Sequence, residues 1–280
     1  MSQATEDAVE QRDSHQRRIR LRTSGRKMGP VMRLIDPGDI AEITKPFVFL
    51  DDASIPPGPK GDMRWHPHSG IGTLTIIFSG KNQYRETTGK EGNVEPDGIE
   101  WMSSGRGVWH AASSIGDTDL VGYQVWMLLP PELELGASHS RHFKANEIQT
   151  KDDVRVLIGS WNGIRGPVPY DNDALLLDVR RNASERFELA PEPGHQVGWI
   201  AVHSGFVSIA GEMVGPGELV VLDDGEEPIA IEAAAASRFL VATARRTEGP
   251  LFLGNSSVHS SAEALQTGLA EIVRLRSTLP

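Results

Sequence analysis

Three histidines stand where they could share one metal ion. His66 and His68 lie two residues apart in the run Trp65-His-Pro-His68, and His110 follows a glycine-rich segment later in the chain. On an extended strand, side chains at i and i+2 point to the same face, so both imidazoles could reach one ion. With His110 they would form a mononuclear site that keeps open coordination positions. The alternative is a pair of partly exposed polar residues beside a turn, which this spacing alone does not exclude.

The composition limits which other chemistry is available. The chain has 280 residues and no cysteine, which excludes disulfides, thiolate metal sites, iron–sulfur clusters and cysteine nucleophiles. A metal must therefore be held by His, Asp, Glu or backbone oxygen. The 28 basic and 38 acidic residues give a net charge of −10, so a nucleic acid is not expected as a partner.

No segment predicts export or membrane insertion. The first residues carry acids from Glu6 onward and lack the apolar core of a signal peptide. The most apolar long stretch, 229–244, is interrupted by Glu232 and Arg238. We therefore expect a cytoplasmic protein with no membrane association.

Short strands separated by turn residues predict an all-β fold. The chain contains 29 glycines and 18 prolines, more than long helices tolerate. Alternating or β-branched apolar runs predict strands at Leu74–Ser79, Gly122–Pro130, Val154–Ser160, Ala174–Arg180, Val197–Ser204, Glu218–Asp223 and Arg238–Ala244. Only the end is expected to be helical, with a cap near Ser260 and an apolar face at Leu265, Leu269, Ile272 and Leu275.

Two halves of the chain resemble each other. The run Ile76–Lys81 resembles Ile200–Phe206, and their Ser-Gly ends at Gly80 and Gly205 are 205 − 80 = 125 residues apart. This similarity suggests two copies of one domain type. The polar stretch 130–152 would connect them, and its His139 and His142 are expected to be solvated.

Several motifs in order resemble the pirin family of bicupins. They cover about residues 20–275 and include Lys45-PFVFLDDAS, His66-PHSGIGTLTIIFSG, Glu95-PDGIEWMSSGRGVWHAASS, Gly122-YQVWMLLPP and Gly215-PGELVVL. The resemblance implies two cupin-type antiparallel β-barrels (double-stranded β-helices) and a short C-terminal helix. We expect a disordered tail at 1–18, an N-terminal cupin domain at 19–140, and a C-terminal cupin domain without metal ligands at 141–280.

The resemblance also assigns the metal centre. The family's metal histidines fall on His66, His68 and His110. The expected ion is Fe(II), with Ni, Zn, Mn and Cu as alternatives; the other possibility is an empty site. A family carboxylate that would be the fourth ligand falls on Ala112, and a second falls on Gly72, so both acids are lost. Three neutral imidazoles should bind iron more weakly than a site with a carboxylate.

Other candidates carry less information. Glu100 could replace the missing acid, but strand alternation does not give its direction. Gln124 stands where pirins keep an inward glutamine, and it could bind a ligand or satisfy a buried turn. The second repeat has Pro191 and Pro193 where His66 and His68 stand, and His195 is expected to be structural. The tryptophans Trp65, Trp101 and Trp109 could line an aromatic pocket or fill the core.

Two functions follow from the resemblance. One is a metal-dependent dioxygenase of the quercetin 2,3-dioxygenase type, acting on a flavonol-like small aromatic substrate. The other is a non-enzymatic regulatory bicupin that binds a protein partner and has a degenerate or empty metal site.

Overall fold

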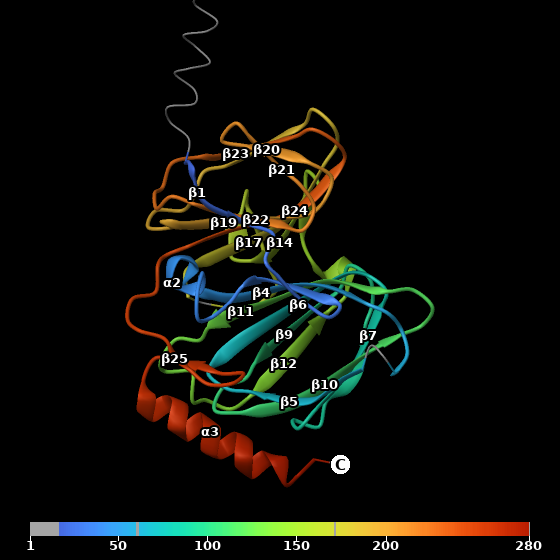
Figure 1. Cartoon of the computed structure of the whole chain (residues 1–280), viewed down its shortest axis with the longest axis vertical. Helices are drawn as coiled ribbons and strands as arrows, with labels where there is room; N and C mark the ends of the chain where they lie inside the picture. Colours follow the sequence, from blue (N-terminus) through green and yellow to red (C-terminus); the bar gives the residue numbers. More distant parts are fainter. Residues whose placement is uncertain (1–16, 60–61, 171, 280) are drawn as a thin grey trace, which may run out of the picture. The chain divides into compact units, whose positions relative to one another are not determined.

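The computed structural model describes residues 17–59, 62–170 and 172–279, and these divide into two compact units. The larger unit consists of Arg26–Ile148 and 247–279, and the smaller of 17–25 and Gln149–Arg246. The expected disordered tail lies outside the described residues, apart from its last two positions. Each unit is an antiparallel β-structure of two sheets (Figure 1).

The larger unit pairs a seven-stranded sheet with a four-stranded one. The first has the order β12 (His139–Phe143), β9 (Ile99–Ser103), β6 (Ile71–Ser79), β11 (Leu120–Leu128), β4 (Phe47–Ile55), β3 (Val31–Ile35) and β2 (Arg26–Met28). The second has the order β5 (Asp62–His68), β10 (Val108–Ile115), β7 (Lys81–Glu86) and β8 (Glu91–Val94). A short ribbon joins β25 (Phe252–Leu253) to β26 (Val258–His259). The helical segments are α2 (Ala41–Thr44), the 3-10 turn η2 (Ala145–Glu147) and α3 (Ala262–Arg276).

The smaller unit repeats this plan. Its seven-stranded sheet has the order β1 (Ile19–Thr23), β22 (Glu218–Leu222), β19 (Val197–Ser204), β24 (Ser237–Ala244), β17 (Ala174–Arg181), β14 (Val154–Ile158) and β13 (Thr150–Lys151). The four-stranded sheet has the order β18 (Arg186–Leu189), β23 (Ile229–Ala233), β20 (Val207–Ile209) and β21 (Glu212–Val214), and a ribbon pairs β15 (Ser160–Trp161) with β16 (Ile164–Arg165).

The strand order shows that the predicted repeat is structural. β6 and β19 occupy the same place in their sheets, and each ends at a glycine with positive φ, +73° at Gly80 and +76° at Gly205. Residues with a side chain rarely adopt a positive φ, so glycine suits both turns. The prediction of an all-β fold with two cupin-type barrels and a C-terminal helix is confirmed.

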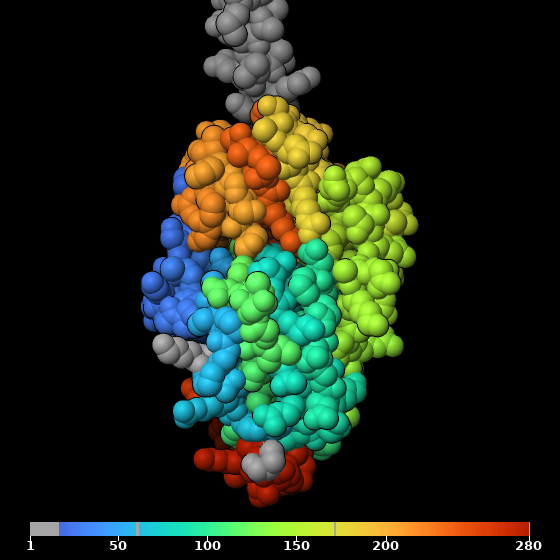
Figure 2. Space-filling view, turned by 90° about the vertical axis from the view of Figure 1, so that its right-hand side faces the viewer, coloured from blue at the N-terminus to red at the C-terminus, as the bar shows by residue number. Residues whose placement is uncertain are grey.

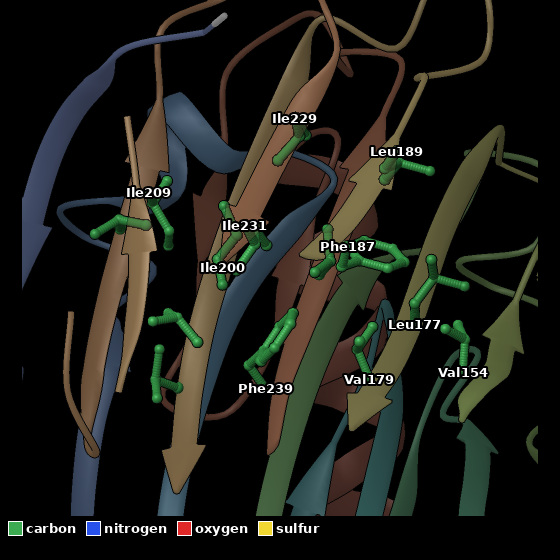
Figure 3. Close-up of a cluster of buried hydrophobic side chains, with 14 of the residues drawn as sticks. Val154, Leu177, Val179, Phe187, Leu189, Ile200, Ile209, Ile229, Ile231 and Phe239 are labelled. Atoms are coloured by element: carbon green, nitrogen blue, oxygen red, sulfur yellow. The ribbon is translucent and has the colours of Figure 1, made fainter. Parts of the chain in front are cut away.

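The two interiors differ in chemistry. Between the sheets of the smaller unit, buried aliphatic and aromatic side chains fill the space, as Figure 3 shows for Phe187, Ile200, Ile231 and Phe239. In the larger unit, an apolar cluster of Ile55, Ile77, Tyr84, Val94 and Leu120 adjoins a cavity that His66, Glu100 and His110 also line. The larger unit therefore has polar groups and open space where the smaller unit has a packed core.

The C-terminal helix packs on the larger unit. Ser261 caps α3 by accepting a hydrogen bond from the Ala264 amide, and the buried stripe is Ala264, Gly268 and Ile272. The indole of Trp109 on β10 donates a hydrogen bond to the Ile272 carbonyl at 2.9 Å. In Figure 2 the red C-terminal residues cover one end of the blue-green strands of this unit. Among the described residues, no helix is long and apolar enough to cross a membrane.

The polar connecting segment contains a strand that the sequence analysis did not expect. Residues 139–143 form β12, which pairs with β9 and places His142 opposite Glu100. Its side chains are mostly polar because they meet polar partners inside the larger unit, so the strand has no apolar alternation. The boundary between the two cupin domains at residues 140 and 141 stays a prediction.

Candidate metal centre

Neighbouring strands bring the three histidines together. In the pairing of β5 with β10, His66 lies directly opposite His110, so their side chains share one face. His68 lies two residues along β5 and points to the same side. Candidate ligand nitrogens of the three rings all lie within 4.8 Å of one another, as the spacing in the sequence predicts for one metal.

Backbone carbonyls fix which nitrogen faces inward in two of the three rings, His66 and His68. Nδ1 of His66 lies 2.8 Å from the Arg64 carbonyl, and Nδ1 of His68 lies 3.0 Å from the Ser256 carbonyl. Because a carbonyl only accepts, both Nδ1 atoms carry the proton and both Nε2 atoms keep a lone pair. This is the arrangement of metal-binding histidines.

The spacing of the inward nitrogens suits a metal. Nε2 of His68 and Nε2 of His110 are 3.1 Å apart. Two ligands at metal–nitrogen distances near 2.1 Å are separated by about 3.0 to 3.4 Å in octahedral or tetrahedral geometry. The donor set, the tautomers and this separation all fit a divalent ion of the iron, nickel or zinc type.

Burial keeps the three rings neutral. Burial, together with the neighbouring His66 and against the raising effect of the Ser256 carbonyl, lowers the pKa of His68 to about 3. The pKa of His110 is lowered well below its ordinary value, first by burial and then by the other two histidines. Burial also lowers the pKa of His66, against the raising effects of the Arg64 carbonyl and the Glu100 charge. Neutral imidazoles are the form that binds a metal.

Two adjoining cavities meet at the histidines. An open hollow of about 620 Å³ is lined by His66 and His68 and by the loop 253–258. A smaller cavity of about 90 Å³, lined by His66, His110 and Glu100, lies deeper in the barrel. Both are also bordered by Gln124. The outer hollow is in the range that binds small organic ligands.

An aromatic stack forms one wall of the outer hollow. The rings of Phe49 and Trp126 stack at 3.8 Å with an angle of 7° between them. The Arg33 guanidinium lies 4.0 Å from the Phe49 ring centre, and the edge of His68 meets Trp126 at 5.0 Å. The wall therefore contributes apolar surface beside His68, and the Arg33 cation lies over the Phe49 ring.

Comparison with known proteins identifies the family. The family profile described as Pirin matches residues 30–127. A pirin-like protein of Caulobacter vibrioides is 30% identical over 246 residues, which cover 84% of this chain and 88% of that protein. The chain belongs to the pirin family. Its expected resemblance to pirins is confirmed.

Solved structures show the same fold for this pirin. A quercetin 2,3-dioxygenase from Acinetobacter baumannii has a TM-score of 0.84 at 19% identity, covering 93% of this chain and 98% of its own. The bacterial pirin YhhW of Escherichia coli, solved in complex with nickel(II), has a TM-score of 0.65 at 18% identity, covering 82% of this chain and 98% of its own.

The two lost carboxylate positions differ in their surroundings. Ala112 is buried and lines the inner cavity with His66 and His110, so space exists there for a longer side chain. A Cβ at Gly72 would instead lie 2.0 Å from the ring of the buried Trp101. This pirin has a tryptophan in the space that an acid at position 72 would enter.

Of the remaining predicted residues, one borders the cavities and the others are structural. Gln124 borders both cavities, and the Trp126 indole donates to its Oε1 at 3.0 Å. His195 is buried and bonded to Thr243 and Asp173, at 2.9 and 3.0 Å, as its structural interpretation expects. None of the tryptophans Trp65, Trp101 and Trp109 lines either cavity.

The solvated state expected for His142 is wrong. Its side chain is only 19% exposed, and its ring stacks on Tyr84 at 3.8 Å. His139, on the same strand, is exposed as expected. The difference arises because β12 is a strand, which sends alternate side chains to opposite faces.

Sequence reasoning missed several residues of the site. The loop carbonyl of Ser256 and the wall residues Phe49 and Trp126 come from segments distant in sequence from the histidines. Glu100, whose direction strand alternation does not give, faces the inner cavity. The wall depends on the pairing of Trp126 on β11 with Phe49 on β4, which the sequence pattern does not give.

Proposed function

We propose that this pirin is a metal-dependent dioxygenase that acts on flavonol-like aromatic substrates. The observation that carries the proposal is the group of three neutral imidazoles, two of which, His66 and His68, have fixed tautomers and line an aromatic-walled hollow. The quercetin 2,3-dioxygenase name of a protein with this fold, and the nickel(II) complex of another, support the choice of reaction and of a divalent ion.

His66, His68 and His110 would hold the metal, with Fe(II) as the expected ion. When bound, such an ion supplies a Lewis-acid and redox centre that orients an oxygen atom of the substrate and dioxygen. The carbonyls of Arg64 and Ser256 keep the His66 and His68 rings in place by accepting from Nδ1.

Protein groups around the histidines would orient the substrate. The Phe49–Trp126 wall offers apolar surface that an aromatic substrate can contact at the side of the hollow. Gln124 accepts from Trp126 through Oε1, so its amide NH₂ is free to donate to a substrate oxygen. The apolar wall also displaces water from the reacting groups, which strengthens those polar contacts.

The carboxylate missing at Ala112 changes what the substrate must supply. Without a base at that position, a flavonol would have to enter as its anion or lose its proton to another group. Arg33, at the edge of the wall, would favour an anionic ligand, although its pairing with Asp51 at 2.6 Å reduces this effect.

Oxygen consumption tests the proposal. Iron-loaded protein is mixed with quercetin, and oxygen uptake and loss of flavonol absorbance are followed together. We expect turnover in the natural chain, at least a hundredfold less in His66→Ala/His110→Ala, and a raised KM in Gln124→Ala. Metal-loaded protein with no flavonol-dependent uptake would contradict the proposal and favour a regulatory, protein-binding bicupin.

A further inference from the structure

A second group of potential ligands lies inside the larger unit. Glu86 on β7, Glu100 on β9 and His142 on β12 have ligand atoms within 4.8 Å of one another. Glu100 and His142 are directly opposite each other in one sheet, and Glu86 is opposite His110 in the other. The three side chains therefore converge from two facing sheets.

The carboxylates of this group are buried and incompletely bonded. Glu86 is 5% exposed and Glu100 is 4% exposed. Oε2 of Glu86 accepts from Thr88 at 2.6 Å and Ser140 at 2.9 Å, whereas Oε1 has no hydrogen-bond partner among the described residues. Oε1 of Glu100 also lacks one. Such buried acceptors are destabilising unless something binds them.

No side-chain cation in the described part of the chain lies within ion-pair distance of either carboxylate, apart from His142 if it is protonated. The Lys90 ammonium, which is nearby, donates to the Ser140 backbone carbonyl instead. Two carboxylates held this close repel each other when both are ionised. A bound cation would remove the repulsion and use the free oxygens.

The contact between His142 and Glu100 has the length expected across a metal. Nε2 of His142 and Oε1 of Glu100 are 3.5 Å apart, and neither atom makes a hydrogen bond. This is long for a hydrogen bond, but two ligands on a tetrahedral ion at about 2.1 Å are separated by about 3.4 Å. Stacking on Tyr84 at 3.8 Å, with an angle of 10°, holds the imidazole in this position.

We propose that Glu86, Glu100 and His142 bind a second divalent cation. Two carboxylates and one imidazole suit Zn(II) or Mn(II), whereas Ca²⁺ takes six to eight oxygen ligands. The site shares no ligand with the three histidines, although Glu100 lines the inner cavity that reaches them. The inference goes beyond the proposed dioxygenase function and does not depend on it.

Zinc titration of the full chain tests the second site. Chelator-treated protein is titrated with Zn(II) by calorimetry, and bound zinc is counted after desalting. Glu86→Gln keeps an oxygen that accepts from Thr88 and Ser140, and His142→Phe keeps a ring to stack on Tyr84. The matched controls are Glu91→Gln, on β8 beside β7, and His139→Phe, on the same strand as His142. Both residues are exposed.

The expected result is two zinc equivalents in the natural chain and in both controls. Glu86→Gln and His142→Phe should each lose one equivalent or bind it at least tenfold more weakly, while His66→Ala/His110→Ala retains it. The proposal is overturned if both site variants bind zinc as the natural chain does, or if the controls lose the same equivalent. A natural chain that binds only the histidine-dependent equivalent overturns it too, and leaves the proposed function standing.

Discussion

At the scale of single residues, the histidine cluster should make the metal-free protein sensitive to acid. Burial lowers the pKa of His68 to about 3, below its ordinary value of 6.5, so the unfolded state binds this proton more readily. The contribution to stability is complete above pH 6.5 and is lost as the pH falls toward 3. One such group changes the unfolding free energy by up to about 1.4 kcal/mol per pH unit in this window.

We therefore expect His68→Phe to have a shallower pH dependence of stability than the natural chain. Urea unfolding between pH 4.5 and 7.5, with a chelator present, measures the two curves. Parallel curves across this range would show that His68 is not held neutral by burial.

Ala112 and Gly72 give opposite expectations for restoring the lost acids. Ala112→Glu should increase metal affinity at least tenfold, because its carboxylate would enter the cavity that His66 and His110 line. The neutral Ala112→Gln is the matched control for size, and calorimetric titration with Ni(II) measures both. Equal affinity in the two variants would mean that position 112 does not reach the metal.

Gly72→Glu should instead destabilise the fold, because the new Cβ would collide with the Trp101 ring. The sequence pattern showed that both acids were absent. It could not show that position 112 is open and position 72 is filled, because the space at position 72 depends on Trp101 of the neighbouring strand β9.

At the scale of elements, α3 should support the metal centre through a close contact at Gly268. A Cβ at this glycine would lie 2.5 Å from Ser69 Oγ and 2.7 Å from His259 Nε2. Ser69 Oγ also donates to Ser257 Oγ at 2.8 Å, next to the loop carbonyl that holds His68. Gly268→Leu should therefore destabilise the protein by about 1 to 3 kcal/mol and weaken metal binding.

Ala270→Leu, on the exposed side of the same helix, is the matched control and should change neither property. Urea unfolding and Ni(II) titration give the two readouts. Unchanged metal affinity in Gly268→Leu, despite lower stability, would show that the helix does not support the His68 ring.

The elements also show which parts of the fold were predictable. Strands such as β6, β19 and β24 have β-branched, buried runs, and the sequence placed each of them correctly. The sequence pattern does not predict β12, because its inward side chains, Ser140 and His142, are polar and lie against other polar groups. Periodicity in hydrophobicity detects a strand only where the buried face is apolar.

At the scale of the whole molecule, one sheet plan occurs twice with different interiors. The core of the smaller unit is apolar, and both groups of three potential metal ligands found among the described residues lie in the larger unit. The repeat of about 125 residues predicted the duplication. It could not predict which barrel is polar inside, because this depends on residues from several paired strands.

Metal should therefore stabilise the unit that contains the histidines. A ligand at one hundred times its Kd stabilises the native state by about 2.7 kcal/mol. Scanning calorimetry with saturating Ni(II) should raise the melting temperature of the natural chain. His66→Ala/His110→Ala should show a smaller rise, and an equal rise in both proteins would place the stabilising metal elsewhere.

Metal content per chain tests the central claim most directly. The natural chain and His66→Ala/His110→Ala are produced side by side in iron-supplemented medium, purified without chelators and analysed by plasma mass spectrometry. The three-histidine centre predicts about one more metal equivalent per chain in the natural protein than in the double variant. Equal metal content in the two proteins, also after soaking with Fe(II), Ni(II) and Zn(II), would contradict it.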